Sequence, residues 1–319
     1  MYLLSIIIPC YNSGVFLRKT IDMLDKEKTD HCEIIFIDDG STDDTLDIIK
    51  RKSESSCNVR YITRENRGVS ASRNEGMLAA EGKYVFFLDS DDEIAEGSVQ
   101  YFQRIIEQYD DEKYDILIFG YKKILTDGKE IEFVNHALNG CELKEEKCAD
   151  LFFRGLLFMN ISSVLFRREY LEKNSLFFED GIKIGEDYDF LRRAALYSEN
   201  ALYNSKICFY YKLRRGSATD GNRRYDSESF KSLLLSIKTA DLAQNRLDKK
   251  TINYYLAARY SAHLFSYLRA PFKSDQINSF FLLNRNCLFQ SMNRGRRKVM
   301  LAIYFFRILP IRMIFKMYK

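Results

Sequence analysis

The sequence predicts an α/β fold with a mostly parallel sheet, flanking helices and a helical C-terminal region. Three observations support this prediction. Short apolar runs alternate with helix-like stretches at the start of the chain, one such run ends directly in a cluster of acids, and the pattern is helical from about residue 226 onward. Alternation of this kind is typical of parallel strands covered by helices on both faces.

Four apolar runs rich in Ile, Val, Phe and Tyr predict the first strands, because such runs are typical of strands buried on both faces. The predicted strands span residues 3–8, 33–38, 59–63 and 84–89. Helical periodicity lies between them, over 15–27, 43–52 and 70–80. Ligands of such sheets bind beyond the carboxyl ends of the strands, so the site is expected in the loops that follow them.

The remainder of the chain alternates less regularly. Asp127-Gly128 is a strong hairpin signal and predicts that 115–126 pairs with 129–134. Further strands are predicted over 163–168 and 201–213, and further helices over 97–109, 142–155 and 186–197. Beyond residue 226 the prediction is helical, with a break at Pro271.

The composition is that of a folded globular protein, with 46% apolar and 29% charged residues in a chain of 319. The formal net charge is +4, but residues 276–319 hold nine Lys and Arg side chains and no acidic one. The rest of the chain therefore carries a net charge of −5. An acidic body with a basic, aromatic-rich tail indicates that the two parts have different roles.

Cysteine usage and the first residues predict a cytoplasmic protein. The seven cysteines are an odd number without a C-x-x-C pair, as expected for free thiols in a reducing compartment. The apolar run at 3–8 is short, follows no basic segment and is broken by Pro9, so it is not expected to be a signal peptide. No segment approaches the roughly 20 apolar residues that span a bilayer.

The loops after the first two predicted strands could hold a pyrimidine base, which needs a flat surface and an acceptor for its N3–H group. Tyr11 could provide the surface, and Asp38 or Asp39 the acceptor, if the two loops are adjacent. The alternative for the second loop is a turn that leads to a helix N-cap at Ser41 or Thr42.

The most informative stretch runs from Phe86 to Asp92, where a buried strand ends in three acids. Asp89 and Asp91 are two residues apart, so an extended backbone would point both side chains the same way. A hard cation such as Mg²⁺ or Mn²⁺ would relieve their repulsion and could bridge them to a substrate phosphate. Arg73, in the preceding predicted helix, could reach the same phosphate or these carboxylates. The alternative for the three acids is a solvated loop that caps the next helix, and the alternative for Arg73 is an ordinary surface arginine.

Four motifs of this kind occur in order, namely Ser5–Asn12 (SIIIPCYN), Ile37–Asp43 (IDDGSTD), Gly68–Asn74 (GVSASRN) and Asp89–Asp92 (DSDD). As a set they closely resemble the motifs of the inverting family 2 glycosyltransferases, which have a GT-A fold. The resemblance covers about the first 100 residues. It implies a nucleotide-sugar donor, usually UDP-linked, and a Mn²⁺ or Mg²⁺ ion.

The resemblance also implies roles for individual residues. Metal binding is implied for Asp89 and Asp91, and a place near the diphosphate for Arg73. The donor-binding residues that it implies in this part of the chain are Pro9, Tyr11, Asn12, Asp39, Asn66, Arg73 and Asp89.

Two weaker matches lie in the second half of the chain. Gly185–Leu191 (GEDYDFL) resembles the family's Glu-Asp motif, whose Asp is the usual base, and this implies catalytic roles for Asp187 and Glu186. Both would open a predicted helix, whose N-terminus favours the ionised form that a base needs. Plain helix stabilisation would explain the same placement.

The second weak match is Tyr211–Ser217 (YKLRRGS), which resembles a donor-binding stretch of the family with Lys212 in place of the common Arg. It implies donor binding by Arg214, Arg215 and Ser217, and either arginine could face the diphosphate.

Together these features predict a metal-dependent inverting glycosyltransferase that transfers a hexosyl or N-acetylhexosaminyl group. The GT-A domain is expected in 1–218, with a nucleotide-sugar-binding part (1–112) and an acceptor-binding part (113–218), and a helical region in 219–319. One rival function, nucleotidyl transfer, would need a Gly-rich triphosphate loop after the first strand, where this sequence has none. The other, a non-catalytic module for nucleic acid or anionic lipid, leaves the acids unexplained, and no nucleic-acid partner is expected.

The expected acceptor is a glycan or a lipid-linked oligosaccharide of polysaccharide biosynthesis, at the inner face of the cell membrane. An ideal helix through 294–319 would gather most of its basic residues on one side and its apolar residues largely on another. Such a helix suits the headgroup region of an anionic membrane, which predicts peripheral attachment. The alternative is that this tail packs on the acidic body or on a second copy of the chain.

Overall fold

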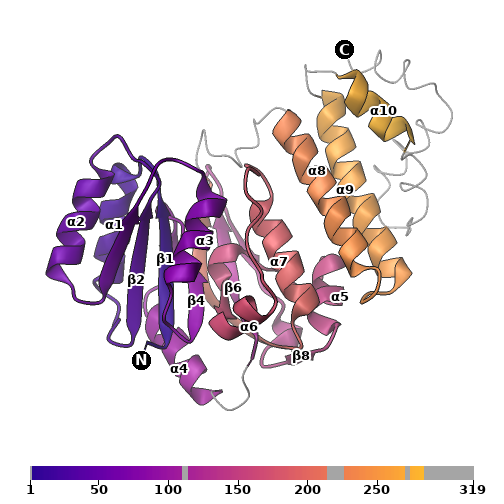
Figure 1. Ribbon diagram of the computed structural model, residues 1–319. Coiled ribbons are helices and arrows are strands. Elements are labelled where there is room, and N and C mark those ends of the chain that lie inside the picture. Colours follow the sequence, from indigo (N-terminus) through magenta and orange to yellow (C-terminus); the bar gives the residue numbers. More distant parts are fainter. Residues whose placement is uncertain (1, 110–113, 214–225, 270–273, 284–319) are drawn as a thin grey trace. The chain divides into compact units, whose positions relative to one another are not determined.

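The computed structural model describes residues 2–109, 114–213, 226–269 and 274–283. The chain forms two compact units, Met1–Asp220 and Gly221–Lys319. Figure 1 shows unit 1 as a sheet with helices and unit 2 as a group of helices.

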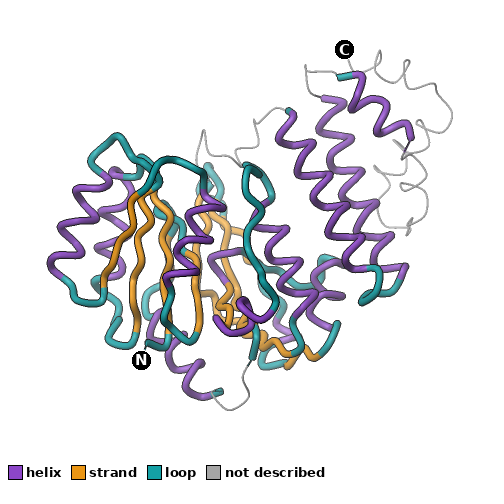
Figure 2. The backbone as a smooth tube through the Cα atoms, in the orientation of Figure 1, coloured by secondary structure: helices purple, strands orange, loops and turns teal. Residues whose placement is uncertain are grey.

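The first half of unit 1 is an all-parallel sheet with the strand order β3-β2-β1-β4. Its strands are β1 (Leu4–Cys10), β2 (Cys32–Asp38), β3 (Val59–Thr63) and β4 (Tyr84–Phe87). The helices between them are α1 (Gly14–Leu24), α2 (Thr45–Ser55) and α3 (Val69–Ala79). This order confirms the predicted parallel α/β arrangement, and Figure 2 shows the strands between helices.

Alternate residues of these strands face opposite helical layers. Ile6, Ile8 and Phe36 are fully buried in the same apolar cluster as residues of α1, α2 and α4 (Ser98–Gln108). Ile7 faces α3 on the other side, where a Cβ atom at Gly76 would collide with it. The absence of a side chain at Gly76 therefore lets α3 lie directly on β1, and this packing fixes where the first turn of α3 meets the carboxyl edge of the sheet.

The second half of unit 1 adds strands of both directions. β9 (Val164–Arg167) lies antiparallel between β4 and β6 (Ile116–Ile124), and β10 (Asn200–Lys212) runs parallel to β6. β5 (Glu93–Ile94) closes this end of the sheet against β10. The predicted hairpin is confirmed, because β7 (Glu130–Phe133) pairs with β6.

Two short elements differ from the sequence prediction. The expected helix over 142–155 is wrong at its start, because β8 (Glu142–Lys144) is a strand antiparallel to β10 and the helix α5 spans Lys147–Phe153. The helix α6 (Arg168–Lys173) was not expected at all. Three-residue 3₁₀ helices lie at His136–Leu138 and Ile161–Ser163. The helix α7 (Glu186–Tyr197) begins at the predicted residue.

Unit 2 consists of helices in its described part, as predicted. They are α8 (Ser227–Ala243), α9 (Lys249–Arg269) and α10 (Asp275–Leu283). Asp226 caps α8, since its Oδ1 accepts the N–H of Ser229 at 2.9 Å. Pro271 and the basic tail at 294–319 lie outside the described residues. Within the described ranges, no helix is both long and apolar enough to cross a membrane.

Candidate active site

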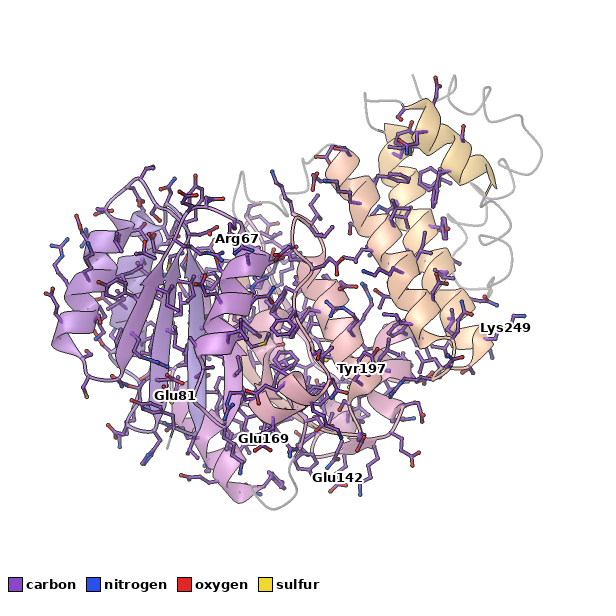
Figure 3. All side chains as sticks on the ribbon, viewed as in Figure 1. Arg67, Glu81, Glu142, Glu169, Tyr197 and Lys249 are labelled. Carbon is purple, nitrogen blue, oxygen red and sulfur yellow. The ribbon has the colours of Figure 1, made fainter. Side chains whose placement is uncertain are left out.

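A cavity of about 300 Å³ opens at the carboxyl edge of β1, β2 and β4. Figure 3 shows Arg67 at this edge of unit 1 and Glu81 at the opposite edge. The residues that line the cavity are Pro9, Cys10, Tyr11, Asn12, Ser13, Phe16, Asp39, Val69, Ser72, Asp89, Ser90 and Asp91. The cavity therefore lies where the sequence predicted a ligand, and five of the seven donor-binding residues expected in this half line it. Asn66 and Arg73 do not.

The loops after β1 and β2 are joined through Asn12. Its Oδ1 accepts the N–H of Thr42 at 2.8 Å, and its own N–H donates to the Oγ of Ser41 at 3.0 Å. Asn12 has a φ of 48°, a left-handed conformation that asparagine tolerates better than most residues. These contacts make the two loops adjacent, as the hypothesis that they bind a pyrimidine base requires. The ring of Tyr11 is half exposed beside them.

Asp39, rather than Asp38, faces the cavity. Asp38 accepts a hydrogen bond from the hydroxyl of Thr63 at 3.0 Å and does not line the cavity. Asp39 accepts the N–H of Arg67 at 3.0 Å and the N–H of Gly68 at 2.7 Å. Arg67 and Arg64 both donate to Oδ1, whereas Oδ2 accepts the N–H of Gly68, so the acceptor capacity left for a ligand is on Oδ2.

Arg64 and Phe16 were missed by the sequence analysis. Arg64 binds Asp39 at 2.9 Å and also contacts Glu75 and Ser72, each at 2.9 Å. The sequence did contain a signal for Arg64, because it directly follows a predicted strand. Its loop is therefore one of those at the carboxyl ends of the strands, where ligands of such sheets bind. Phe16 lines the cavity from the first turn of α1 and is partly exposed. Asn66 is exposed in the same loop as Arg64.

The acids after β4 form a turn, so the expected extended backbone is wrong. The N–H of Asp92 donates to the backbone oxygen of Asp89 at 3.0 Å. Ser90, within the turn, is held by the hydroxyl of Thr20, which donates to its backbone oxygen at 2.8 Å. Asp89 and Asp91 nevertheless line the same cavity, because the turn brings both to it.

The chemistry of this pair fits a hard cation, whose preferred ligands are carboxylate oxygens. No group of three or more His, Cys, Asp or Glu side chains suited to a metal ion occurs among the described residues. An ion held by Asp89 and Asp91 would therefore complete its coordination with water and substrate phosphates, as Mg²⁺ commonly does.

Arg73 is buried behind Asp89 and does not line the cavity. Its Nη2 donates to the Oδ1 of Asp89 at 2.7 Å, and its Nη1 lies 3.4 Å from the Oε1 of Glu186. The ring of Phe178 lies 5.2 Å from the guanidinium carbon. Burial opposes the charge of Arg73, but the carboxylates of Asp89 and Glu186 outweigh it and raise its pKa.

Glu186 and Asp187 occupy the first turn of α7, after Gly185 in a left-handed conformation with φ 80°. Burial, reinforced by the charge of Asp187, raises the pKa of Glu186 to about 7, although Arg73 acts in the opposite direction. Burial likewise raises the pKa of Asp187. The helix N-terminus was expected to keep both groups ionised, but burial of two adjacent carboxylates is the stronger effect.

The remaining predicted donor-binding residues, Arg214, Arg215 and Ser217, lie outside the described residues. These three residues follow β10, whose last residue is Lys212. Lys212 forms an ion pair with Glu93 at 2.6 Å. Glu93 lies in β5, directly after the acidic turn. The end of β10 and the turn after β4 are thus neighbours.

The fold defines the class to which the protein belongs. A crystal structure of Staphylococcus aureus TarS, residues 1–349 in complex with UDP-GlcNAc, matches with a TM-score of 0.70 and 21% identity over 90% of this chain and 80% of that one. The fold is therefore GT-A. The model of glycosyl transferase family 2 matches residues 5–175, which is more than half of the chain. The chain belongs to that family.

Two relatives show how far the likeness extends. The uncharacterized glycosyltransferase EpsJ of Bacillus subtilis is 29% identical over 68% of this chain and 63% of its own, so the chain spans less than two thirds of that relative. The GalNAc(5)-diNAcBac-PP-undecaprenol beta-1,3-glucosyltransferase of Campylobacter jejuni is 27% identical over 99% of this chain and 96% of its own.

Proposed function

We propose that the protein is an inverting glycosyltransferase that moves a sugar from a UDP-linked donor to a glycan or lipid-linked acceptor in polysaccharide biosynthesis. One observation carries this proposal. Asp89, which follows β4, and Glu186, which begins α7, bind the same guanidinium beside a cavity of about 300 Å³. Asp89 belongs to the part of the chain expected to bind the donor (the donor side), and Glu186 to the part expected to bind the acceptor (the acceptor side). Carboxylates from the two sides thus meet at one guanidinium.

The donor's base is proposed to lie on the ring of Tyr11, with its N3–H directed to Asp39. UDP is favoured because the TarS structure of the same fold was solved with UDP-GlcNAc. The transferred group is proposed to be a hexosyl or an N-acetylhexosaminyl group, since the C. jejuni relative is named as a glucosyltransferase and TarS as an N-acetylglucosaminyltransferase.

Asp89 and Asp91 are proposed to hold Mn²⁺ or Mg²⁺ together with the diphosphate. When bound, such an ion would stabilise the negative charge that develops on the leaving diphosphate. Asp187 is proposed to take the proton of the acceptor hydroxyl as that oxygen attacks the anomeric carbon from the face opposite the nucleotide. Glu186 lies beside it and competes for the same proton, because two adjacent carboxylates cannot ionise independently.

Turnover with UDP-glucose, UDP-galactose and UDP-N-acetylglucosamine in the presence of Mn²⁺ tests the proposed function. We expect one donor to be consumed, EDTA to stop the reaction, and the product to have the opposite anomeric configuration by its NMR coupling constant. Retention of configuration would contradict single displacement. Full activity in EDTA would contradict the metal, and consumption of none of the donors would contradict UDP-sugar transfer by this site.

A membrane-bound acceptor is the most specific part of the proposal. The name of the C. jejuni relative contains a PP-undecaprenol group. The basic residues of 294–319 would hold the enzyme at an anionic surface, each contributing about 1 kcal/mol. Co-sedimentation with phosphatidylglycerol vesicles should therefore be strong for the full chain and weak for a chain that ends at Met292. Equal sedimentation of the two would show that the tail is not the attachment site.

A further inference from the structure

Arg73 was expected beside the donor diphosphate, but its surroundings are those of a buried structural charge. Its side chain is 3% exposed, and it is absent from the residues that line the cavity. Both of its terminal nitrogens already face carboxylates, Asp89 at 2.7 Å and Glu186 at 3.4 Å. A phosphate in the cavity would meet Asp89, which lines it, before it met Arg73, which does not.

The position of Arg73 is fixed from a third side by Phe178. The ring of Phe178 lies 5.2 Å from the guanidinium carbon and stacks on Phe190 with 4.0 Å between centroids. Asn74, the next residue along α3, holds the backbone of Phe178 with two hydrogen bonds, of 2.8 and 3.0 Å. The face of the guanidinium is therefore covered by a ring that is itself anchored, which leaves Arg73 little freedom to turn toward the cavity.

We propose that Arg73 is a positioning residue that holds Asp89 and Glu186 at the same time, rather than a ligand of the diphosphate. The inference rests on the proposed function, because it assigns Asp89 to the donor side and Glu186 to the acceptor side. A planar guanidinium can bind two carboxylates in fixed directions, whereas a lysine ammonium is a point charge on a flexible stem. Arg73 thereby keeps the two sides of the reaction in one geometry.

The two roles predict opposite effects on donor binding. A diphosphate ligand contributes a charge-assisted hydrogen bond, so its removal would weaken binding by about tenfold or more. A positioning residue competes with the cation for Asp89, so its removal should leave the affinity for UDP with Mn²⁺ unchanged or higher. The rate should fall in both cases, because in the second Glu186, the neighbour of the proposed base Asp187, is no longer held.

The experiment measures the affinity of the full chain for UDP with Mn²⁺ by calorimetry, and for Mn²⁺ alone by electron paramagnetic resonance. Arg73→Met should bind UDP with Mn²⁺ at least as tightly as the wild type, while kcat falls by about tenfold or more. Arg73→Lys should show the same low kcat, because a lysine cannot bridge both carboxylates. Arg51→Met is the matched control, since Arg51 is an exposed arginine of α2 that does not line the cavity, and it should change neither quantity.

Each outcome decides between the two roles. Weaker binding of UDP with Mn²⁺ by Arg73→Met, or recovery of wild-type kcat in Arg73→Lys, would overturn the positioning role. Arg73→Lys keeps the buried positive charge and carries the test if Arg73→Met does not fold by circular dichroism. If the wild type itself binds no UDP with Mn²⁺, the proposed function fails and the inference falls with it. If only the variants lose affinity or activity, the proposed function of the wild type still holds.

Discussion

The two sides of the candidate site are built from different interactions. On the donor side, the loops after β1 and β2 are fixed largely by side chains that bind backbone N–H groups, as Asn12 does for Thr42 and Asp39 does for Gly68. On the proposed acceptor side, Glu186 is bound by the buried guanidinium of Arg73, and the same charge favours the ionised form of the neighbouring Asp187. Hydrogen bonds to backbone N–H groups set the shape of these two loops. Buried charges instead make the acceptor side sensitive to protonation and to the loss of any one partner.

The largest expected effect is on the acceptor side. Asp187→Asn should lower kcat by about 10²-fold or more, because an amide cannot take the proton of the acceptor hydroxyl. The affinity for UDP with Mn²⁺ should stay at the wild-type value, since the donor side is fixed independently. Steady-state kinetics and calorimetry check the two halves of this statement. A variant that keeps more than about a tenth of wild-type kcat would show that Asp187 is not the base.

The next effect is on the donor side and appears in stability. Asp39→Ala should lower the free energy of unfolding by about 2–4 kcal/mol, because it leaves two backbone N–H groups without an acceptor and removes one of the carboxylates that bind Arg64. Urea unfolding measures this loss. Asp39→Asn is the control, because its amide oxygen preserves one acceptor and should cost less. Equal losses for the two variants would mean that the carboxylate charge, rather than the acceptor atoms, holds the loop.

The dependence on pH should separate the two sides further. The proposed base, Asp187, must be deprotonated, and it shares a proton with Glu186, whose pKa is raised to about 7, so kcat should rise with pH up to about 7 and level off above it. Below that pH, kcat should fall about tenfold per unit. Glu186→Gln removes the neighbouring negative charge, so its rise in kcat should lie at lower pH. An unchanged profile in Glu186→Gln would show that the two carboxylates do not share the proton.

The raised pKa of Glu186 affects stability in the opposite direction, because its contribution to stability falls, whereas kcat rises, as the pH increases toward about 7. The folded chain binds the proton of Glu186 more tightly than the unfolded chain, in which a glutamate has a pKa of about 4.3. The contribution of Glu186 to stability is therefore most favourable below that value, and it is lost as the pH rises through about 7. Thermal unfolding of the wild type and of Glu186→Gln between these pH values measures the difference.

The smallest expected effect concerns the contact between the donor-side loops. Asn12→Ala should cost about 1–2 kcal/mol of stability, because alanine loses the bond to Thr42 and is strained at a φ of 48°. Asn12→Gly loses the bond without the strain and should cost less. If both variants unfold like the wild type in urea, the contact between the loops is not needed to shape the cavity.

The same contrast explains what the sequence could predict. The strands and helices of the first half follow from local apolar patterns, and they place Tyr11, Asp39 and Asp89 around one cavity. β8 was read as part of a helix because three residues carry too little pattern, and its strand conformation depends on pairing with β10. The turn at Asp89 was also missed, because an acidic run after a strand has no pattern of its own.

The burial of Arg73 could not be predicted from its motif. The residues that enclose it, Phe178 and Glu186, lie more than a hundred positions further along the chain. Their approach to α3 depends on the complete sheet. The motif identifies Arg73 as a residue with a role, and the tertiary structure places it behind Asp89 instead of in the cavity.

The insertion of β9 between β4 and β6 has a consequence for how the protein forms during synthesis. β4 is the edge of the parallel sheet until β9 arrives, and Arg167 follows Phe87 by roughly eighty residues. At about 5–20 residues per second, the ribosome needs on the order of ten seconds to supply the missing strand. During that time the nascent chain presents an apolar, unpaired strand edge, a site at which chains associate. The donor side of the enzyme is thus complete in sequence well before it is protected in structure.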